Sequence, residues 1–172
     1  MQQAVGNLTA KSRAAGLEIF IATPMSAFDS RKYSENREKV IALVDAIRRK
    51  APGAKIFCPA LEIADSKKWD LSDEALEQDI AALERADLFI LLYLSPLPPK
   101  PSSVLVEAGI ALGKNIPSIY LINDRADLPY MLNNAESFSH SGQQITIVQD
   151  QSMDGLIASA LTHLAEAQNV LL

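Results

Sequence analysis

The sequence predicts an α/β fold: one doubly wound domain of three layers, with a mostly parallel five-stranded sheet of the flavodoxin or Rossmann-like kind. Short apolar runs alternate along the chain with longer segments of helical periodicity, and this alternation is typical of βαβ units. The runs 88–94 and 118–122 are apolar almost throughout, as strands buried on both faces of a parallel sheet are. A chain of 172 residues with 48% hydrophobic residues also suits a single domain with a well-filled core.

The same patterns place each element in order. The expected strands cover residues 17–22, 55–58, 88–94, 118–122 and 144–148. The expected helices cover residues 33–50, the segment after the cap Ser72, the segment from Ser103 to the terminating Gly113, and residues 129–133 and 153–167. Residues 1–16 are small and polar with weak periodicity, so we expect an N-terminal arm outside the core and a domain spanning residues 17–172.

Two aspartates, Asp79 and Asp87, come shortly before the expected central strand 88–94. In the helix after Ser72, the apolar residues Leu76, Ile80 and Leu83 are spaced to form a buried stripe. Asp79 lies about 60° to one side of this stripe, so its carboxylate either leans over the carboxyl edge of the sheet or points to solvent. Asp87 directly precedes the strand 88–94 and therefore lies at the opposite, amino edge, where we expect a structural role. Residues 59–71 are expected to form a loop.

The composition excludes several classes of function. A net charge of −5 argues against a nucleic-acid partner, whose phosphates require a basic surface. No run of about 18 apolar residues occurs, so no membrane partner is expected. The single cysteine and the absence of an apolar signal core near residue 1 favour a reducing, cytoplasmic location. Two histidines and one cysteine offer no metal cluster, and neither a GxGxxG fingerprint nor a Walker loop is present. We therefore expect no metal and no cofactor.

Glu107 is the residue with the clearest candidate chemistry. It stands in an apolar segment after Ser103, in which no other residue can ionise before Lys114. It follows Ser103 by four residues, one too many for a capping box, and this spacing places both side chains on one helix face. The helix leaves the loop after strand 88–94, at the carboxyl edge where open α/β folds bind ligands. Such a carboxylate either reacts with a ligand or is an ordinary surface glutamate, and its apolar surroundings favour the reactive role.

Further candidate ligand-binding residues lie at the same edge. Ser102 and Ser103 open the helix, whose free amide groups suit an anion such as phosphate, although a serine there also serves as an ordinary cap. Gly109 would allow a ligand or another backbone to approach the helix closely. The remaining candidates follow from their positions at strand ends alone: Thr23, Pro24, Met25, Tyr93 and Asn123.

Three segments together resemble the nucleoside 2-deoxyribosyltransferase superfamily, which includes nucleotide N-glycosidases of the same fold. The segments are IFIATPM at 19–25, LEQDIAALERADLFI at 76–90 and SSVLVEAGIALGKNIPSI at 102–119. Within the last segment, Glu107 matches the catalytic glutamate of the family, and the matching neighbours are Gly109, Gly113 and Lys114. Asp79 and Asp87 match the family's pattern of two aspartates separated by seven residues.

This resemblance implies a retaining reaction at a glycosidic bond. Glu107 would attack the anomeric carbon of a nucleoside or nucleoside 5′-monophosphate, and Asp79 would hold or protonate the departing base. Water or a second base would resolve the glycosyl ester, so a hydrolase and a transferase both remain open. The resemblance implies a small-molecule nucleoside or nucleotide as partner, no cofactor, and a homo-oligomer, a dimer or tetramer, whose neighbouring chains complete each pocket.

Two alternatives remain beside this reading. The serine turn and helix glutamate also resemble those of TIR domains that cleave the nicotinamide bond of NAD, so a TIR-like NAD hydrolase is the second enzymatic hypothesis. The non-enzymatic hypothesis is a nucleotide-binding signalling module in which Glu107 only binds a ribose.

Overall fold

A five-stranded sheet, parallel throughout, forms the centre of the protein, as the sequence predicts. The computed structural model describes residues 16–24, 30–62, 73–94, 103–138 and 144–171. The strands are β1 Glu18–Ala22, β2 Lys55–Phe57, β3 Leu88–Tyr93, β4 Ser118–Ile122 and β5 Ile145–Gln149, in the spatial order β2-β1-β3-β4-β5. This is the flavodoxin-like order of doubly wound folds. The predicted N-terminal arm lies outside the described residues, apart from Gly16.

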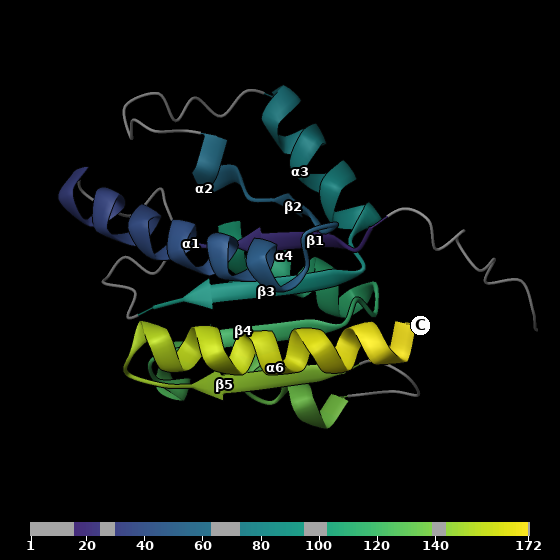
Figure 1. Cartoon of the computed structure of the whole chain (residues 1–172). Coiled ribbons are helices and arrows are strands. Elements are labelled where there is room, and N and C mark those ends of the chain that lie inside the picture. The colour runs from purple at the N-terminus through teal and green to yellow at the C-terminus, as the bar shows by residue number, and fades with distance from the viewer. Residues whose placement is uncertain (1–15, 25–29, 63–72, 95–102, 139–143, 172) are drawn as a thin grey trace, which may run out of the picture.

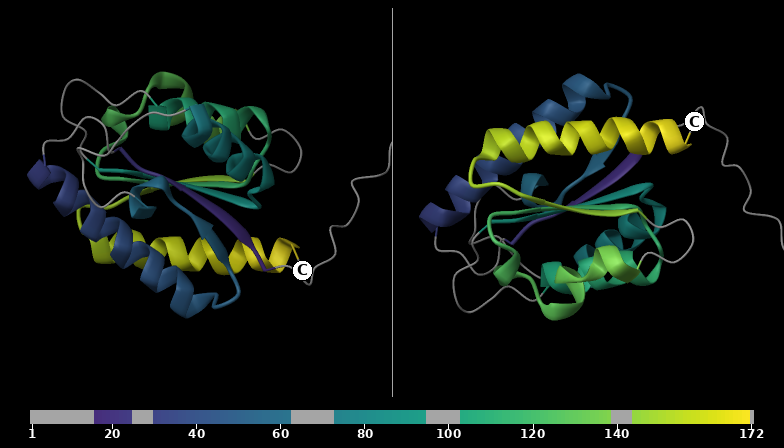
Figure 2. Two further views of the ribbon diagram at one scale, coloured as in Figure 1. Left: turned by 90° about the horizontal axis from the view of Figure 1, so that it is seen from above. Right: turned by 90° about the horizontal axis from the view of Figure 1, so that it is seen from below.

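Helices cover both faces of this sheet. The helices are α1 Ser30–Lys50, α2 Pro59–Glu62, α3 Asp73–Arg85, α4 Ser103–Gly113, α5 Tyr130–Asn133 and α6 Met153–Leu171, with short 3₁₀ turns η2 Arg125–Asp127 and η3 Ala135–Phe138. Figure 1 shows α1 and α6 in front of the sheet, and the two views of Figure 2 show α3, α4 and α5 together on the opposite face. Two separate apolar clusters fill the spaces between these layers.

The strand order fixes where a ligand site can form. The chain leaves β1 through α1 on one face of the sheet and leaves β3 through α4 on the other face (Figure 2). Since β1 and β3 are neighbours, their carboxyl ends form the switch point at which doubly wound folds open a crevice. All six residues of β3 are buried, so the switch point lies over the best-covered strand of the sheet.

Two local predictions were wrong. The stretch 59–71 was expected to be a loop, but its first residues form α2, which packs against α1 through the buried Ala60. The apolar stripe of α3 was expected to be buried, and Leu83 is, but Leu76 is 61% exposed and Ile80 is 40% exposed. The residues of α3 that pack on the sheet are Ala82 and Leu83, because only the last turns of the helix lie over the core.

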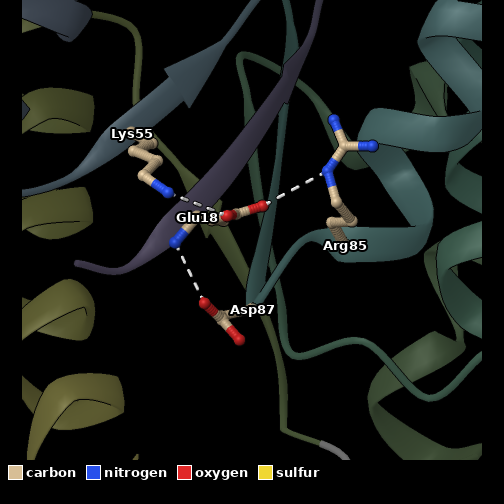
Figure 3. Close-up of polar contacts among 4 residues, drawn as sticks. All are labelled: Glu18, Lys55, Arg85 and Asp87. Carbon is tan, nitrogen blue, oxygen red and sulfur yellow. Dashed lines mark hydrogen bonds and ion pairs between the residues drawn. The ribbon is translucent and has the colours of Figure 1, made fainter. Parts of the chain in front are cut away.

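A polar cluster joins β1, β2 and β3 at the amino edge of the sheet (Figure 3). The Glu18 N–H donates to Asp87 Oδ2 at 2.9 Å, and the Asp87 N–H donates to the Glu18 carbonyl at 2.8 Å. The Glu18 carboxylate also pairs with Lys55 Nζ at 3.3 Å and with Arg85 Nε at 3.6 Å. Asp87 therefore has the structural role that the sequence predicts for it.

Candidate functional site

Glu107 lies about one turn inside α4, beside the face that packs on the sheet. The buried residues of this helix are Val104, Ala108 and Ala111, which recur at helical spacing. Glu107 follows Val104 by three residues and precedes Ala111 by four, so its side chain borders the buried stripe. The residue is half-buried rather than solvated, in contrast to Val106, which is 60% exposed. The apolar composition of the helix thus places one carboxylate at the boundary of the core.

The electrostatics of Glu107 are unusual for a glutamate. Its pKa is raised from 4.5 to about 8, first because burial disfavours the charged form and second because the negative charge of Asp79 acts on it. Asp79 is itself half-buried and lies on α3, so the two helices bring these carboxylates near one another on the same face of the sheet. Two acids that share a site in this way favour states in which one of them keeps a proton.

The turn after β1 is held by a residue that the sequence analysis did not identify. Asn36, only 6% exposed on α1, donates from Nδ2 to Thr23 Oγ1 at 3.0 Å and to the Pro24 carbonyl at 3.0 Å. Thr23 and Pro24 are therefore fixed at the carboxyl end of β1, beside the switch point. The available signal was that Asn36 falls in register with the buried Tyr33 and Val40, where a polar residue requires a partner. Met25, predicted with them, lies outside the described residues.

Tyr93 ends β3 at the same edge. It is fully buried, and its hydroxyl has no hydrogen-bond partner in the part of the chain that the structure describes. Burial and, to a smaller extent, the charge of Asp127 raise the pKa of this phenol. A buried hydroxyl at a strand end beside the switch point is suited to meet a ligand.

Asn123 follows β4 but is engaged in the protein. Its Nδ2 donates to the Asp150 carbonyl at 2.8 Å, and its own carbonyl accepts from Gln151 Nε2 at 2.9 Å. These bonds tie the end of β4 to the connection between β5 and α6. A ligand contact from Asn123 stays a prediction, and any such contact would be added to this structural role.

The predicted residues at the start of α4 are only partly defined. Ser103 is the first helical residue and is exposed, while Ser102 lies outside the described residues. Gly109 is exposed, and no described atom lies within 4 Å of the position that a Cβ would occupy there. The prediction that another backbone segment approaches Gly109 closely is therefore wrong for the described residues. A contact between Gly109 and a ligand stays a prediction.

A surface hollow of about 440 Å³ lies at the amino edge, away from the switch point. Its walls include Glu84, Asp87 and Lys114. These charges are already engaged, because Lys114 Nζ pairs with Glu84 Oε1 at 2.9 Å and Asp87 accepts from the Glu18 N–H. The hollow thus offers concave surface without the acid pair that chemistry at Glu107 would use.

The described ranges contain neither a metal-binding cluster nor a membrane-spanning helix. No group of three or more His, Cys, Asp or Glu side chains there is arranged to hold a metal ion. Among those same residues, no helix combines the length and the apolar character needed to cross a bilayer.

Comparison with solved structures identifies the architecture. The chain superposes on the CMP N-glycosidase BcmB of Clostridium botulinum with a TM-score of 0.60 and 15% identity, over 83% of this chain and 96% of that one. It superposes on BlsM with a TM-score of 0.61 and 17% identity, over 92% and 93% of the two chains. The chain has the nucleoside 2-deoxyribosyltransferase-like fold. A conserved protein from Enterococcus faecalis V583 has the same fold at a TM-score of 0.50 and 22% identity, over 92% of this chain and 100% of that one. No protein-family profile and no curated protein sequence matches the chain.

Proposed function

We propose that this protein cleaves the N-glycosidic bond of a nucleoside or nucleoside 5′-monophosphate, with Glu107 as the nucleophile. The observation that carries the proposal is the pair formed by Glu107 and Asp79, two half-buried carboxylates on adjacent helices beside the switch point. Perturbed acids in the crevice of an α/β fold are typical of catalytic sites. The nucleoside 2-deoxyribosyltransferase-like fold, shared with a CMP N-glycosidase, supports the same assignment.

The chemistry requires the two acids in different protonation states. The ionised Glu107 attacks the anomeric carbon, the C–N bond breaks, and its electron pair leaves with the base. Asp79 supplies the proton that the departing base nitrogen needs. Water then attacks the glycosyl ester, gives its proton back to Asp79, and releases the sugar together with the free Glu107 carboxylate. In the free protein the raised pKa of Glu107 keeps the shared proton on Glu107 near neutral pH. The reactive state therefore requires that this proton passes to Asp79 when the substrate binds, after which Asp79 donates it while Glu107 attacks.

A phosphorylated substrate is the form that we favour. Helix α4 begins at Ser103 and has no acidic residue in its first turn, so its positive end is not neutralised from within the helix. A 5′-phosphate bound by Ser102 and Ser103 would place the sugar over the next turn, which carries Glu107. The CMP N-glycosidase with the same fold acts on a nucleotide, which supports this choice.

We also propose that a second copy of the chain covers the helical face that carries Glu107. Five large apolar side chains are exposed on α3, α4 and α5: Leu76, Ile80, Val106, Tyr130 and Met131. Tyr130 is the most exposed of these, at 80%. Apolar patches of this kind mark association surfaces. Val106 adjoins Glu107 in the sequence, so a second copy on this face would border the acid pair and help to exclude water.

Base release tests the proposal directly. The protein is incubated with the common nucleoside monophosphates, the corresponding nucleosides and deoxynucleosides, and NAD, and released bases are separated by chromatography. We expect a nucleobase from at least one monophosphate, and no release by Glu107→Gln although this variant melts at or above the temperature of the wild type near pH 6. Glu77→Gln, an exposed acid on α3, is the matched control and should keep full activity.

Other results would select the alternatives. Nicotinamide as the only product would indicate a TIR-like NAD hydrolase, and retained nucleotide binding without any release would indicate a signalling module. An active Glu107→Gln variant would remove Glu107 from the role of nucleophile.

A further inference from the structure

Two tyrosines of the sheet share an unusual property. Tyr93 on β3 and Tyr120 on β4 are both fully buried, and both belong to the apolar cluster beneath α4 and α5. The hydroxyl oxygen of each has no hydrogen-bond partner among the described residues. A buried polar atom without a partner is costly, and each one in a folded protein calls for an explanation.

The surroundings of the two hydroxyls differ. Tyr120 lies in the middle of β4, paired in register with Leu91, and burial alone raises its pKa to about 12. Tyr93 is the last residue of β3 and pairs with Ile122, the last residue of β4. The chain beyond Ile122 turns into η2, and the charge of Asp127 in that turn acts on the Tyr93 phenol. Tyr93 therefore has a carboxylate near it at the carboxyl edge, and Tyr120 lies within the core.

Tyr93 is also connected to the site of the proposed reaction. Its side chain belongs to the same buried cluster as Val104 and Ala108, the residues of α4 that flank the position of Glu107. A sugar placed with its anomeric carbon at Glu107 would extend along the carboxyl edge, where β3 and β4 end.

We infer that the Tyr93 hydroxyl and the Asp127 carboxylate together bind a hydroxyl group of the substrate's sugar. This inference rests on the proposed function and deepens it, since it names the feature of the sugar that the site reads. A sugar hydroxyl both accepts and donates, so it can accept from the Tyr93 O–H while it donates to Asp127. A base carbonyl offers no donor and an ammonium group offers no acceptor, so neither can bridge the two. An ionised carboxylate accepts several hydrogen bonds, so Asp127 can take part while it keeps contacts within the protein.

The test removes one oxygen atom at a time. Tyr93→Phe deletes the hydroxyl and keeps the ring, and Tyr120→Phe is the matched control, with the same change in the same cluster. Because neither hydroxyl has a hydrogen-bond partner within the described ranges, both variants should fold and melt at or above the temperature of the wild type. For the monophosphate that the wild type cleaves best, kcat/KM of Tyr93→Phe should fall roughly 10- to 100-fold. Tyr120→Phe should stay within about twofold of the wild type.

Deoxy substrates identify the group that is bound. The wild type should discriminate against either the 2′-deoxy or the 3′-deoxy form of that substrate by a similar factor of about 10 to 100. Tyr93→Phe should lose this discrimination. If the two hydroxyls form one hydrogen bond, removing either of them breaks it, so the two losses in kcat/KM are not additive in a double-mutant cycle.

Three results would overturn the inference. They are wild-type kcat/KM in Tyr93→Phe, equal losses in both phenylalanine variants, and unchanged sugar discrimination in Tyr93→Phe. Absence of base release by the wild type would instead refute the proposed function. Calorimetric titration of the same nucleotide and its deoxy forms would then decide the inference, and equal affinities for wild type and Tyr93→Phe would reject it.

Discussion

Glu18 and Asp87 exchange two hydrogen bonds at the amino edge of the sheet, although 69 positions separate them in the chain. The Glu18 N–H donates to Asp87 Oδ2 at 2.9 Å, and the Asp87 N–H donates to the Glu18 carbonyl at 2.8 Å. The first bond satisfies a main-chain donor at the start of β1. The pair lies one residue ahead of Ile19 and Leu88, where the register of β1 and β3 begins, and so helps to align the two strands.

We expect Asp87→Ala to destabilise the fold without affecting base release. The variant leaves the half-buried Glu18 N–H without its acceptor, at a cost of about 1–2 kcal/mol. Urea unfolding measures this loss, and Lys55→Ala, which breaks only an exposed ion pair, should change stability by less than about 0.5 kcal/mol. Lower catalytic activity in folded Asp87→Ala would contradict the purely structural role.

Asp79→Asn should lower the pKa of Glu107. The charge of Asp79 is the second cause of the raised pKa after burial, so its removal should bring the value below about 8 but leave it above 4.5. NMR titration of the Glu107 side-chain carboxyl carbon measures this without relying on activity. Glu77→Gln, on the exposed side of the same helix, should leave the titration of Glu107 unchanged. An unaltered pKa in Asp79→Asn would show that the two acids are not coupled.

Glu107→Gln should be more stable than the wild type at alkaline pH. The folded protein keeps a proton on Glu107 that the unfolded chain loses, so wild-type stability falls as pH rises from about 4.5 to about 8. Glutamine does not titrate, so the advantage of the variant should grow over this range. It should reach on the order of 2 to 3 kcal/mol by pH 9, once screening by solvent is allowed for. Thermal melts at pH 5 and pH 9 measure it, and an equal difference at both would be incompatible with the raised pKa.

Tyr130→Glu should dissociate the proposed oligomer. Tyr130 is 80% exposed on the face formed by α3, α4 and α5, where a buried charge would be costly in an interface. Light scattering coupled to size-exclusion chromatography should give a larger mass for the wild type than for the variant. Ala42→Glu adds the same charge at an exposed position of α1, on the other side of the sheet, and should not alter the mass. A monomeric wild type would rule out the oligomer.

Two glycines should respond in opposite directions to alanine. A Cβ at Gly155 would overlap the Asp150 carboxylate, which accepts from the Ser152 N–H at 2.8 Å in front of α6. The Ser152 hydroxyl also donates to Asp150 and caps α6 by accepting from the Gly155 N–H at 3.1 Å. Gly155→Ala should therefore disturb this cap and cost about 1–2 kcal/mol. Gly109→Ala meets open space in a helix and should stabilise by about 0.5–1 kcal/mol. Chemical unfolding of both variants checks the contrast, which would fail if Gly155→Ala were neutral.

Most of the fold could be predicted because its strands are unambiguous. The predicted strand 118–122 has the observed bounds, the first three strands differ by one residue at one end, and the fifth is shifted by one residue. In a parallel sheet these bounds also determine which loops meet at the carboxyl edge, so the place proposed for the candidate site follows from the same pattern. Helix faces were harder to predict. Leu76 and Ile80 have the spacing of a buried stripe, yet spacing cannot show whether the sheet, another copy or solvent covers them.

The candidate site could be predicted only where one residue contrasted with its neighbours. Glu107 was visible because an acid is rare in so apolar a segment. The coupling of Glu107 to Asp79, the support that Asn36 gives to Thr23, and the charge of Asp127 beside Tyr93 all depend on how separate elements pack. Since each of these pairs joins different elements, helical or strand periodicity alone could not reveal them.

The position of β1 between β2 and β3 also has a consequence for biosynthesis. Parallel neighbours cannot form from a hairpin, so β1 must wait for two distant segments, and closing such long chain loops is entropically slow. On the ribosome, a nascent chain that ends before residue 88 leaves the backbone N–H and C=O groups along one edge of β1 unpaired. Premature termination or pausing in this region would therefore yield fragments that aggregate, and the protein should depend on chaperones most strongly while the third strand is being synthesised.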